Sequence, residues 1–239
     1  VIAAVMSPGI DHAQVFKGHI TSVWEPIIWQ AVFMFLTIGI IAAGVVNGIQ
    51  KWSTILMPIL FILLIVLIVR SVTLPGALEG IIYYLKPDFS EVTGRTLLGA
   101  ISQAFFSLSL GMGVFITYGS YLRRQDEIPA SAVSIVSLDT IVALLAGFAI
   151  FPAVFALGFA PGAGPGLVFI TLPAVFAQMP FGIVFGVLFF VLLGIAALTS
   201  AISLLEVVSA WLIDENGWKR RQAAIVMGFV IFVVGIPAS

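Results

Sequence analysis

Oxygen-bearing side chains interrupt three long apolar segments of this sequence. Two serines and two glycines lie close together within Phe105–Gly113, inside the first of these segments. They favour a local break in a helix, because serine hydroxyls bond to nearby backbone and glycine admits unusual backbone angles. Inside a bilayer such a break is tolerated only where protein or a water-lined cavity receives the freed amides and carbonyls. The stretch is therefore a candidate for ligand binding, and a packing face of small residues is the alternative.

Two acidic residues, Asp139 and Glu206, also fall within apolar segments. An ionisable side chain at membrane depth costs roughly 2.5–3.5 kcal/mol, so each should face the protein interior and have a partner. At ~1.5 Å of helical rise per residue, Ser107 and Asp139 both lie about 15 Å from the membrane surface, near its midplane. For Glu206, a structural role between helices and a functional role remain equal alternatives.

The third polar group is a stripe on one helical face, at positions i, i+1, i+4 and i+7. Its members are Thr199, Ser200, Ser203 and Glu206. Three segments thus bring hydroxyl, carbonyl and carboxylate oxygens to one level, a set that suits a hard cation such as Na⁺ better than a transition metal. The alternative is that the hydroxyls simply bond back to their own helix. No pair of residues resembles a catalytic set, so we do not expect an enzyme.

Composition places these residues in a membrane. The 239 residues are 61% hydrophobic and 9% charged, with a mean hydropathy of +1.21. An all-α integral membrane protein embedded in a lipid bilayer is the class that fits. The net charge of -1 gives no reason to expect nucleic acid, and the absence of cysteine excludes disulfides and thiolate metal sites.

Apolar runs predict about six membrane-spanning helices. They cover residues 26–46, 53–73, 97–122, 130–157, 180–213 and the chain from 223 onward. Residues 1–24 are predicted to form an extracellular loop, and residues 158–179 an extracellular re-entrant or surface-lying piece. A tight link is expected at 47–52 and a charged loop at 79–95. Because the chain starts at Val1 and stops within an apolar run, residues 1–239 are interpreted as one transmembrane domain within a longer protein.

The basic residues support an orientation. With six alternating spans, three loops share one side and together carry six of the ten basic residues, which the positive-inside rule places in the cytoplasm. These are Lys51, Arg123, Arg124, Lys219, Arg220 and Arg221.

Several motifs resemble one transporter family. The run Phe105-Phe106-Ser107-Leu108-Ser109-Leu110-Gly111, followed by Thr117–Tyr121, is similar to the unwound sixth helix of neurotransmitter:sodium symporters. Phe169–Phe176 resembles the extracellular loop after the seventh helix of that family, and Ala196–Ser200 resembles its eighth-helix sodium motif. The match covers nearly the whole chain in order and corresponds to helices four through nine of twelve. Within the family, Met112 and Asp139 most resemble bacterial transporters of several hydrophobic amino acids.

The resemblance implies a fold and an activity. The fold would be the inverted-repeat architecture of the leucine transporter type, with one helix unwound at the midplane, a general feature of such transporters. The activity would be Na⁺-coupled symport of hydrophobic amino acids, aliphatic and aromatic, by alternating access. Its partners would be the amino-acid substrate, the bilayer and the remaining helices of the same transporter. Its location would be the bacterial inner membrane, crossed several times.

The resemblance also assigns residues. The first sodium site would take Ser107 and Asp139, and the second Ala196 (by its carbonyl), Thr199 and Ser200; residues outside this segment would complete both. The substrate pocket would take Phe106, Ser107, Ser109, Met112, Ser200 and Leu204. Gln103 would lie near the extracellular gate, and Tyr121 and Asp214 in the intracellular gate.

Two departures from the family pattern bear on ions and specificity. Met112 stands where the leucine transporter has Phe, and a flexible, polarisable side chain suits varied apolar substrates. Ala143 stands where chloride-dependent members have Ser and many chloride-independent ones have Glu. We expect ionised Asp139 to supply the negative charge itself and make transport chloride-independent. Two rival interpretations remain: a proton-coupled transporter that uses Asp139 or Glu206, and a non-transporting membrane sensor or channel-like protein on the same scaffold.

Overall fold

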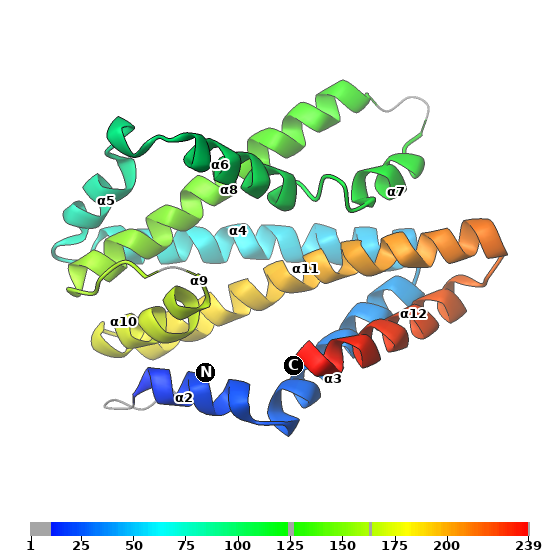
Figure 1. The fold of residues 1–239 in the computed structure, drawn as a ribbon, viewed down its shortest axis with the longest axis horizontal. Helices are drawn as coiled ribbons and strands as arrows, with labels where there is room; N and C mark the ends of the chain where they lie inside the picture. The colour runs from blue at the N-terminus through cyan, green and yellow to red at the C-terminus, as the bar shows by residue number, and fades with distance from the viewer. Residues whose placement is uncertain (1–10, 124–126, 163, 239) are drawn as a thin grey trace.

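The computed structural model describes residues 11–123, 127–162 and 164–238, and within those ranges it contains helices and turns but no strands. Figure 1 shows the arrangement. The elements are α2 (His12–Thr21), α3 (Trp24–Ala42), the π-helix η1 (Val45–Gln50), α4 (Lys51–Val72), α5 (Ala77–Leu85), the 3-10 helix η2 (Phe89–Glu91), α6 (Gly94–Ser107), α7 (Val114–Ser120), α8 (Ile128–Ala156), α9 (Gly164–Gly166), the π-helix η3 (Leu167–Thr171), α10 (Leu172–Gln178), α11 (Gly182–Asn216), α12 (Arg220–Gly235) and the 3-10 helix η4 (Ile236–Ala238).

All six predicted spans are helical. Among the described residues, four helical segments are long and apolar enough to cross a membrane: α3, η1 together with α4, α8 and α11. The third predicted span is divided into α6 and α7, and the sixth is the 16-residue α12. The break in the third span lies inside Phe105–Gly113, where the serines and glycines predicted it.

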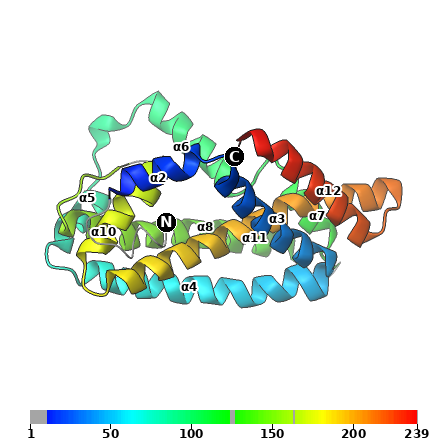
Figure 2. The same ribbon diagram turned by 90° about the horizontal axis from the view of Figure 1, so that it is seen from below.

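Helix α11 runs along the bundle and connects its two apolar cores (Figure 1). One core joins α4, α8, α10 and α11 around Leu67, Val154 and Phe176. The other joins α3, η1, α11 and α12 around Ile41 and Ile202. Figure 2 shows α4 on one side of the bundle and α6 on the other. Each end of α11 is therefore held in a packed core.

The predicted link at 47–52 is wrong in detail. The chain turns earlier, at Gly44, whose φ of 98° lies in the left-handed region that glycine adopts at little cost. From Val45 it forms the π-helix η1, which continues directly into α4. Gly48 permits the close approach of η1 to α3, because a Cβ there would lie 1.9 Å from the carbonyl oxygen of Ile40.

Two segments predicted as loops contain helices. Within 1–24, helix α2 follows Asp11, whose carboxylate accepts the backbone N–H groups of Ala13 at 2.9 Å and Gln14 at 3.3 Å; residues 1–10 of that predicted loop lie outside the described part of the chain. Within 79–95, the charged residues favoured a loop, but the chain forms the amphipathic helix α5 there. This helix packs on α8, with the ring of Tyr84 stacked 5.1 Å from that of Phe151. The extracellular placement of 1–24 and of 158–179, now α9, η3 and α10, stays a prediction.

The basic loops gather at one end of the bundle. The start of α4, the connection from α7 to α8 and the connection from α11 to α12 all lie at the same end in Figures 1 and 2. Lys51, Arg123 and Lys219 lie in these segments, as the alternating-loop argument requires. Arg124 lies outside the described residues.

Replacing Gly80 with alanine should destabilise the bundle. An added Cβ would lie 2.4 Å from the carbonyl oxygen of Phe151 on α8, and backbone cannot easily move away. Overpacking of this kind costs about 1–3 kcal/mol. We expect the midpoint of thermal unfolding of the full-length protein to fall for Gly80→Ala. The matched control is Gly18→Ala on the surface helix α2, where nothing lies within 4 Å of the added atom; an equal fall for both variants would contradict the prediction.

Candidate functional site

The helix break is a defined backbone motif. Helix α6 ends at Ser107 and α7 begins at Val114. The N–H of Leu110 donates to the Phe105 carbonyl at 2.9 Å, and the N–H of Ser109 donates to the Phe106 carbonyl at 3.0 Å. This pair of bonds is the Schellman pattern that ends a helix.

Three residues in the break have left-handed backbone angles. Their φ values are 54° for Ser109, 83° for Gly111 and 79° for Gly113. Ser109 occupies the position after the helix end where glycine is usual, and a non-glycine residue there carries backbone strain. Such strain concentrates at functional sites. At Gly113, a Cβ would lie 3.0 Å from Val207, so glycine also permits the close approach of this segment to α11.

The end of α6 contacts the acidic residue of α8. The hydroxyl of Ser107 donates to Oδ1 of Asp139 at 2.6 Å. Asp139 lies well inside the 29-residue α8 and is half-buried, whereas Ser107 is exposed. The two residues that the sequence analysis placed near the midplane therefore meet. Their three side-chain oxygens offer a hard cation a compact set of ligands.

The second candidate ion site lies within one turn of α11. Thr199 and Ser200 donate their hydroxyl hydrogens to the Ala196 carbonyl, at 2.9 and 3.2 Å. This is the back-bonded arrangement that the sequence analysis kept as an alternative. It still leaves lone pairs on both hydroxyl oxygens, so the group fits a cation that accepts oxygen ligands. In the ranges that the structure covers, no cluster of three or more His, Cys, Asp or Glu could hold a metal.

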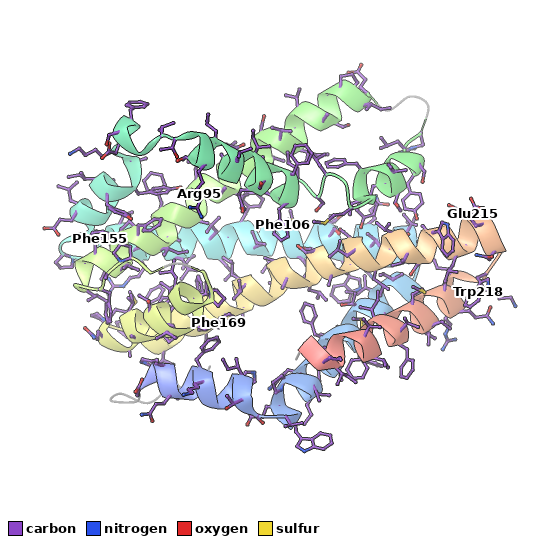
Figure 3. All side chains as sticks on the ribbon, in the orientation of Figure 1. Arg95, Phe106, Phe155, Phe169, Glu215 and Trp218 are labelled. Atoms are coloured by element: carbon purple, nitrogen blue, oxygen red, sulfur yellow. The ribbon has the colours of Figure 1, made fainter. Side chains whose placement is uncertain are left out.

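The predicted substrate-pocket side chains are open rather than enclosed. Exposed fractions are 68% for Phe106, 37% for Met112 and 47% for Leu204. Phe106 belongs to the last turn of α6, beside the break (Figure 3). Ser109 is partly buried, and Ser200 is exposed on α11.

The predicted gating residues are not brought together. Gln103 is exposed on α6, and Asp214 is exposed near the end of α11. Tyr121 follows α7 and donates its hydroxyl hydrogen to Glu206, not to Asp214. The roles of these residues stay predictions.

Comparison with known proteins gives a consistent answer. A family model described as the sodium:neurotransmitter symporter family matches residues 12–238. The chain belongs to the sodium:neurotransmitter symporter family. An uncharacterised sodium-dependent transporter of Bacillus subtilis (strain 168) is 47% identical over 232 residues, which are 96% of this chain and 51% of that protein. The sodium-dependent serotonin transporter of Drosophila melanogaster is 32% identical over 88% of this chain and 35% of its own length.

A solved structure supports the fold of this symporter chain. The crystal structure of MhsT in complex with L-phenylalanine superimposes with a TM-score of 0.88 at 49% identity, covering 98% of this chain and 54% of that one. The resemblance to the family and the helical transporter fold are thus confirmed. The chain spans about half the length of its bacterial relatives.

In this member of the family, Glu206 has a strong partner that the sequence analysis missed. Glu206 is fully buried on α11. Oε1 accepts hydrogen bonds from Tyr121 and from the guanidinium of Arg220 at the start of α12, with Nη1 at 3.1 Å. The contact links the broken helix, α11 and α12 at the end where the basic loops gather.

The signal for this cluster was present in the sequence but incomplete. A buried acid requires a partner, yet Arg220 lies fourteen residues away, past the turn at Gly217, and was counted as a topology charge. The structure shows that the turn brings α12 back against α11. A further contact, from the Tyr118 hydroxyl to Ser203 at 3.1 Å, joins α7 to α11 in the same region.

Arg220→Gln should destabilise the protein more than Arg221→Gln does. Removing one partner of a buried ion pair costs about 3–5 kcal/mol, because the other charge stays buried. We expect a large fall in the thermal unfolding midpoint of the full-length protein, and a much smaller further fall when Arg220→Gln is added to Glu206→Gln. The control is Arg221→Gln, whose side chain is exposed. Equal effects at 220 and 221, or fully additive effects in the double variant, would refute the pairing.

Proposed function

We propose that this chain is the central part of a Na⁺-coupled symporter of hydrophobic L-amino acids that works by alternating access. The observation that carries the proposal is the hydrogen bond of 2.6 Å from Ser107 to Asp139 across the helix break. It joins a strained end of one helix to an acid in the middle of another. Broken helices at the membrane midplane are where secondary transporters of this architecture bind substrate and ions.

The environments of the two membrane-depth acids differ in the way that ion binding requires. The charge of Glu206 is offset by the guanidinium of Arg220. In the described part of the chain, Asp139 has a hydroxyl partner but no cationic one. Its charge is therefore available to a Na⁺ ion, which is a co-transported substrate here.

The coupling follows from shared ligands. We assign Ser107 and Asp139 to a first Na⁺ site, and Ala196, Thr199 and Ser200 to a second; residues outside this segment complete each. An amino-acid carboxylate beside the first site would add an oxygen ligand to its ion. Substrate and Na⁺ then each improve the affinity for the other by the same factor.

The proposed substrate class rests on the side chains around the break. Phe106, Met112 and Leu204 present apolar surface, and methionine adapts its shape to different partners. MhsT, the 49% identical protein of known structure, was crystallised with L-phenylalanine. We assign the protein to the bacterial inner membrane with its basic loops in the cytoplasm, where the remaining helices of the transporter complete the site.

Binding of labelled leucine and tryptophan to the full-length protein should depend on Na⁺. We expect affinity for both to rise at least about tenfold when Na⁺ replaces choline, which corresponds to a coupling of about 1.4 kcal/mol. Equilibrium binding measures this directly.

Uptake into vesicles, measured beside this binding, separates the rivals. Uptake driven by a pH gradient in Na⁺-free medium would favour a proton-coupled transporter. Binding without accumulation in vesicles that carry a Na⁺ gradient would favour a sensor. Either result would overturn the proposal.

Asp139→Asn should expose a need for chloride. If ionised Asp139 supplies the negative charge of the first site, wild-type uptake is indifferent to chloride, whereas the variant loses Na⁺-driven uptake and regains part of it when chloride replaces gluconate. Uptake into vesicles with each anion is the measurement. The control is Thr140→Ser, because the Thr140 hydroxyl bonds back to the Val136 carbonyl at 2.9 Å. Variant uptake that is unchanged and still indifferent to chloride would contradict the assignment.

A further inference from the structure

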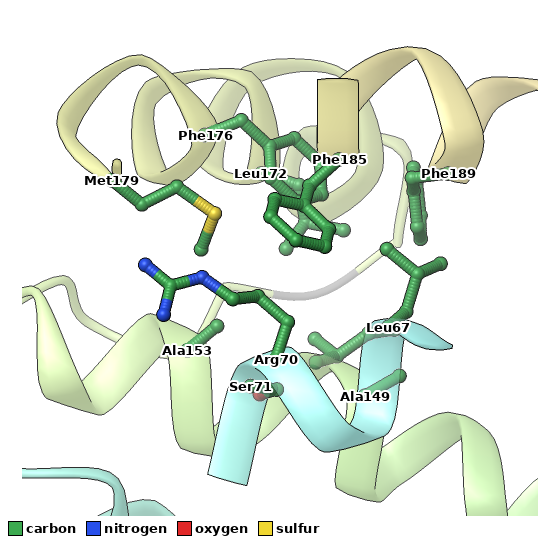
Figure 4. Close-up of a pocket in the computed structure, with 11 residues that line it drawn as sticks. Leu67, Arg70, Ser71, Ala149, Ala153, Leu172, Phe176, Met179, Phe185 and Phe189 are labelled. Carbon is green, nitrogen blue, oxygen red and sulfur yellow. The ribbon is translucent and has the colours of Figure 1, made fainter. Parts of the chain in front are cut away.

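A small cavity lies at the end of the bundle away from the basic loops. Helices α4, α8, α10 and α11 enclose it, and its volume is about 10 Å³. Arg70 and Ser71, in the last turn of α4, are the polar residues among those that line it, and the others are apolar. Figure 4 shows Arg70 extending from α4 toward Met179 and Ala153, with the Phe185 ring facing it.

Ser71 lines this cavity and has a hydroxyl without a hydrogen-bond partner. The side chain is 2% exposed, and its Oγ has no hydrogen-bond partner. Two other hydroxyls of the same helix region behave differently: Thr54 and Thr73 each donate to the carbonyl four residues earlier at 2.8 Å. Back-bonding is the ordinary arrangement for such residues. A buried hydroxyl without it costs free energy unless a ligand accepts its hydrogen.

Arg70 supplies positive charge without a carboxylate. Its Nε is buried and has no partner, and its guanidinium carbon lies 5.6 Å from the centre of the Phe185 ring. The ring partly compensates the charge. In the resolved lining of the cavity there is no acidic side chain. The side chain as a whole is half-buried, and its Nε is the atom that lacks both solvent and a partner. A bound anion would satisfy this donor and offset the charge.

The size of the cavity limits the ligand. About 10–15 Å³ is the space that one water molecule needs. Carboxylates and phosphates are therefore too large, which leaves a water molecule or a monatomic ion. Fluoride is similar in size to water, and chloride is larger and would need the lining to widen. The first turn of α11, which carries Phe185, adds the positive end of a helix dipole, and the end of α4 adds a negative end of similar size, about half an electron each. The two offset one another, so the net positive charge at the cavity comes from Arg70. Two N–H and O–H donors beside a full positive charge select an anion.

We propose that Arg70 and Ser71 form a binding site for a single halide-sized anion, chloride being the abundant one. The ion would accept hydrogen bonds from Arg70 Nε and Ser71 Oγ and would join α4 to the α10–α11 junction. The site lies away from Ser107 and Asp139 and stabilises the fold without taking part in the proposed coupling. It does not rest on the proposed function.

The test is the thermal unfolding midpoint of the full-length protein at constant Na⁺ and ionic strength, with gluconate replaced stepwise by chloride or by fluoride. We expect a saturable rise for wild type in one halide or both. Ser71→Ala should need at least about tenfold more halide for the same rise, and Arg70→Gln should show no rise. Ser71→Ala keeps the test valid if Arg70→Gln does not fold, because it removes one oxygen atom.

Two controls locate the ion. Ser209, on α11 near Glu206, also has a buried hydroxyl without a hydrogen-bond partner. Ser209→Ala removes it and should keep the wild-type response. Thr73→Val removes a nearby hydroxyl that already bonds back to the Val69 carbonyl, and should also keep the response. An identical midpoint for wild type in all three anions would mean that the cavity holds water and would overturn the proposal. A response that survives Ser71→Ala unchanged, or disappears with Thr73→Val, would place the ion elsewhere and overturn it equally.

Discussion

Backbone hydrogen bonding at membrane depth is the constraint on which this structure depends. A helix satisfies its own amides and carbonyls, and a break at the midplane leaves some of them without partners in a medium that supplies none. Here two backbone hydrogen bonds of the Schellman type end α6. Ser109, Gly111 and Gly113 then continue the chain toward α7 in left-handed conformations. At the end of α6 the Ser107 hydroxyl donates to Asp139 of α8. The strain and the acid are both explained if ligands complete the coordination there.

The second determinant is how each buried charge is balanced. Glu206 and Arg220 neutralise one another inside the protein, with Tyr121 as an additional donor. This contact ties α7, the second half of the broken helix, to α11 and α12. Asp139 instead accepts a hydrogen bond from the neutral hydroxyl of Ser107. The two acids of this bundle therefore differ in environment: the compensated one holds helices together, and the one without a cationic partner is the one that we propose binds Na⁺.

Much of this could be predicted from the sequence. Apolar length predicted the helices, since only continuous apolar segments can cross a bilayer, and the serines and glycines of Phe105–Gly113 predicted the break. The prediction failed where local and tertiary signals compete. Glu79 made an amphipathic helix resemble a loop, and the turn at Gly44 was missed because apolar residues continue through it. The partner of Glu206 could not be named, because no local pattern specifies which helix returns to contact it.

The distribution of packing explains why the candidate ion ligands lie where they do. The two apolar cores lie toward the ends of the bundle, one around Leu67 and Phe176 and one around Ile41 and Ile202. Ser107 and Asp139 fall outside both cores, whereas the turn at Ala196–Ser200 borders the second one through Leu198. The oxygen-bearing side chains among these residues are exposed or half-buried. Close-packed interiors resist small displacements, whereas a region held by a few hydrogen bonds does not. Placing hydroxyls and one uncompensated carboxylate between two rigid ends lets ligands change the local geometry without disturbing the packing that maintains the fold.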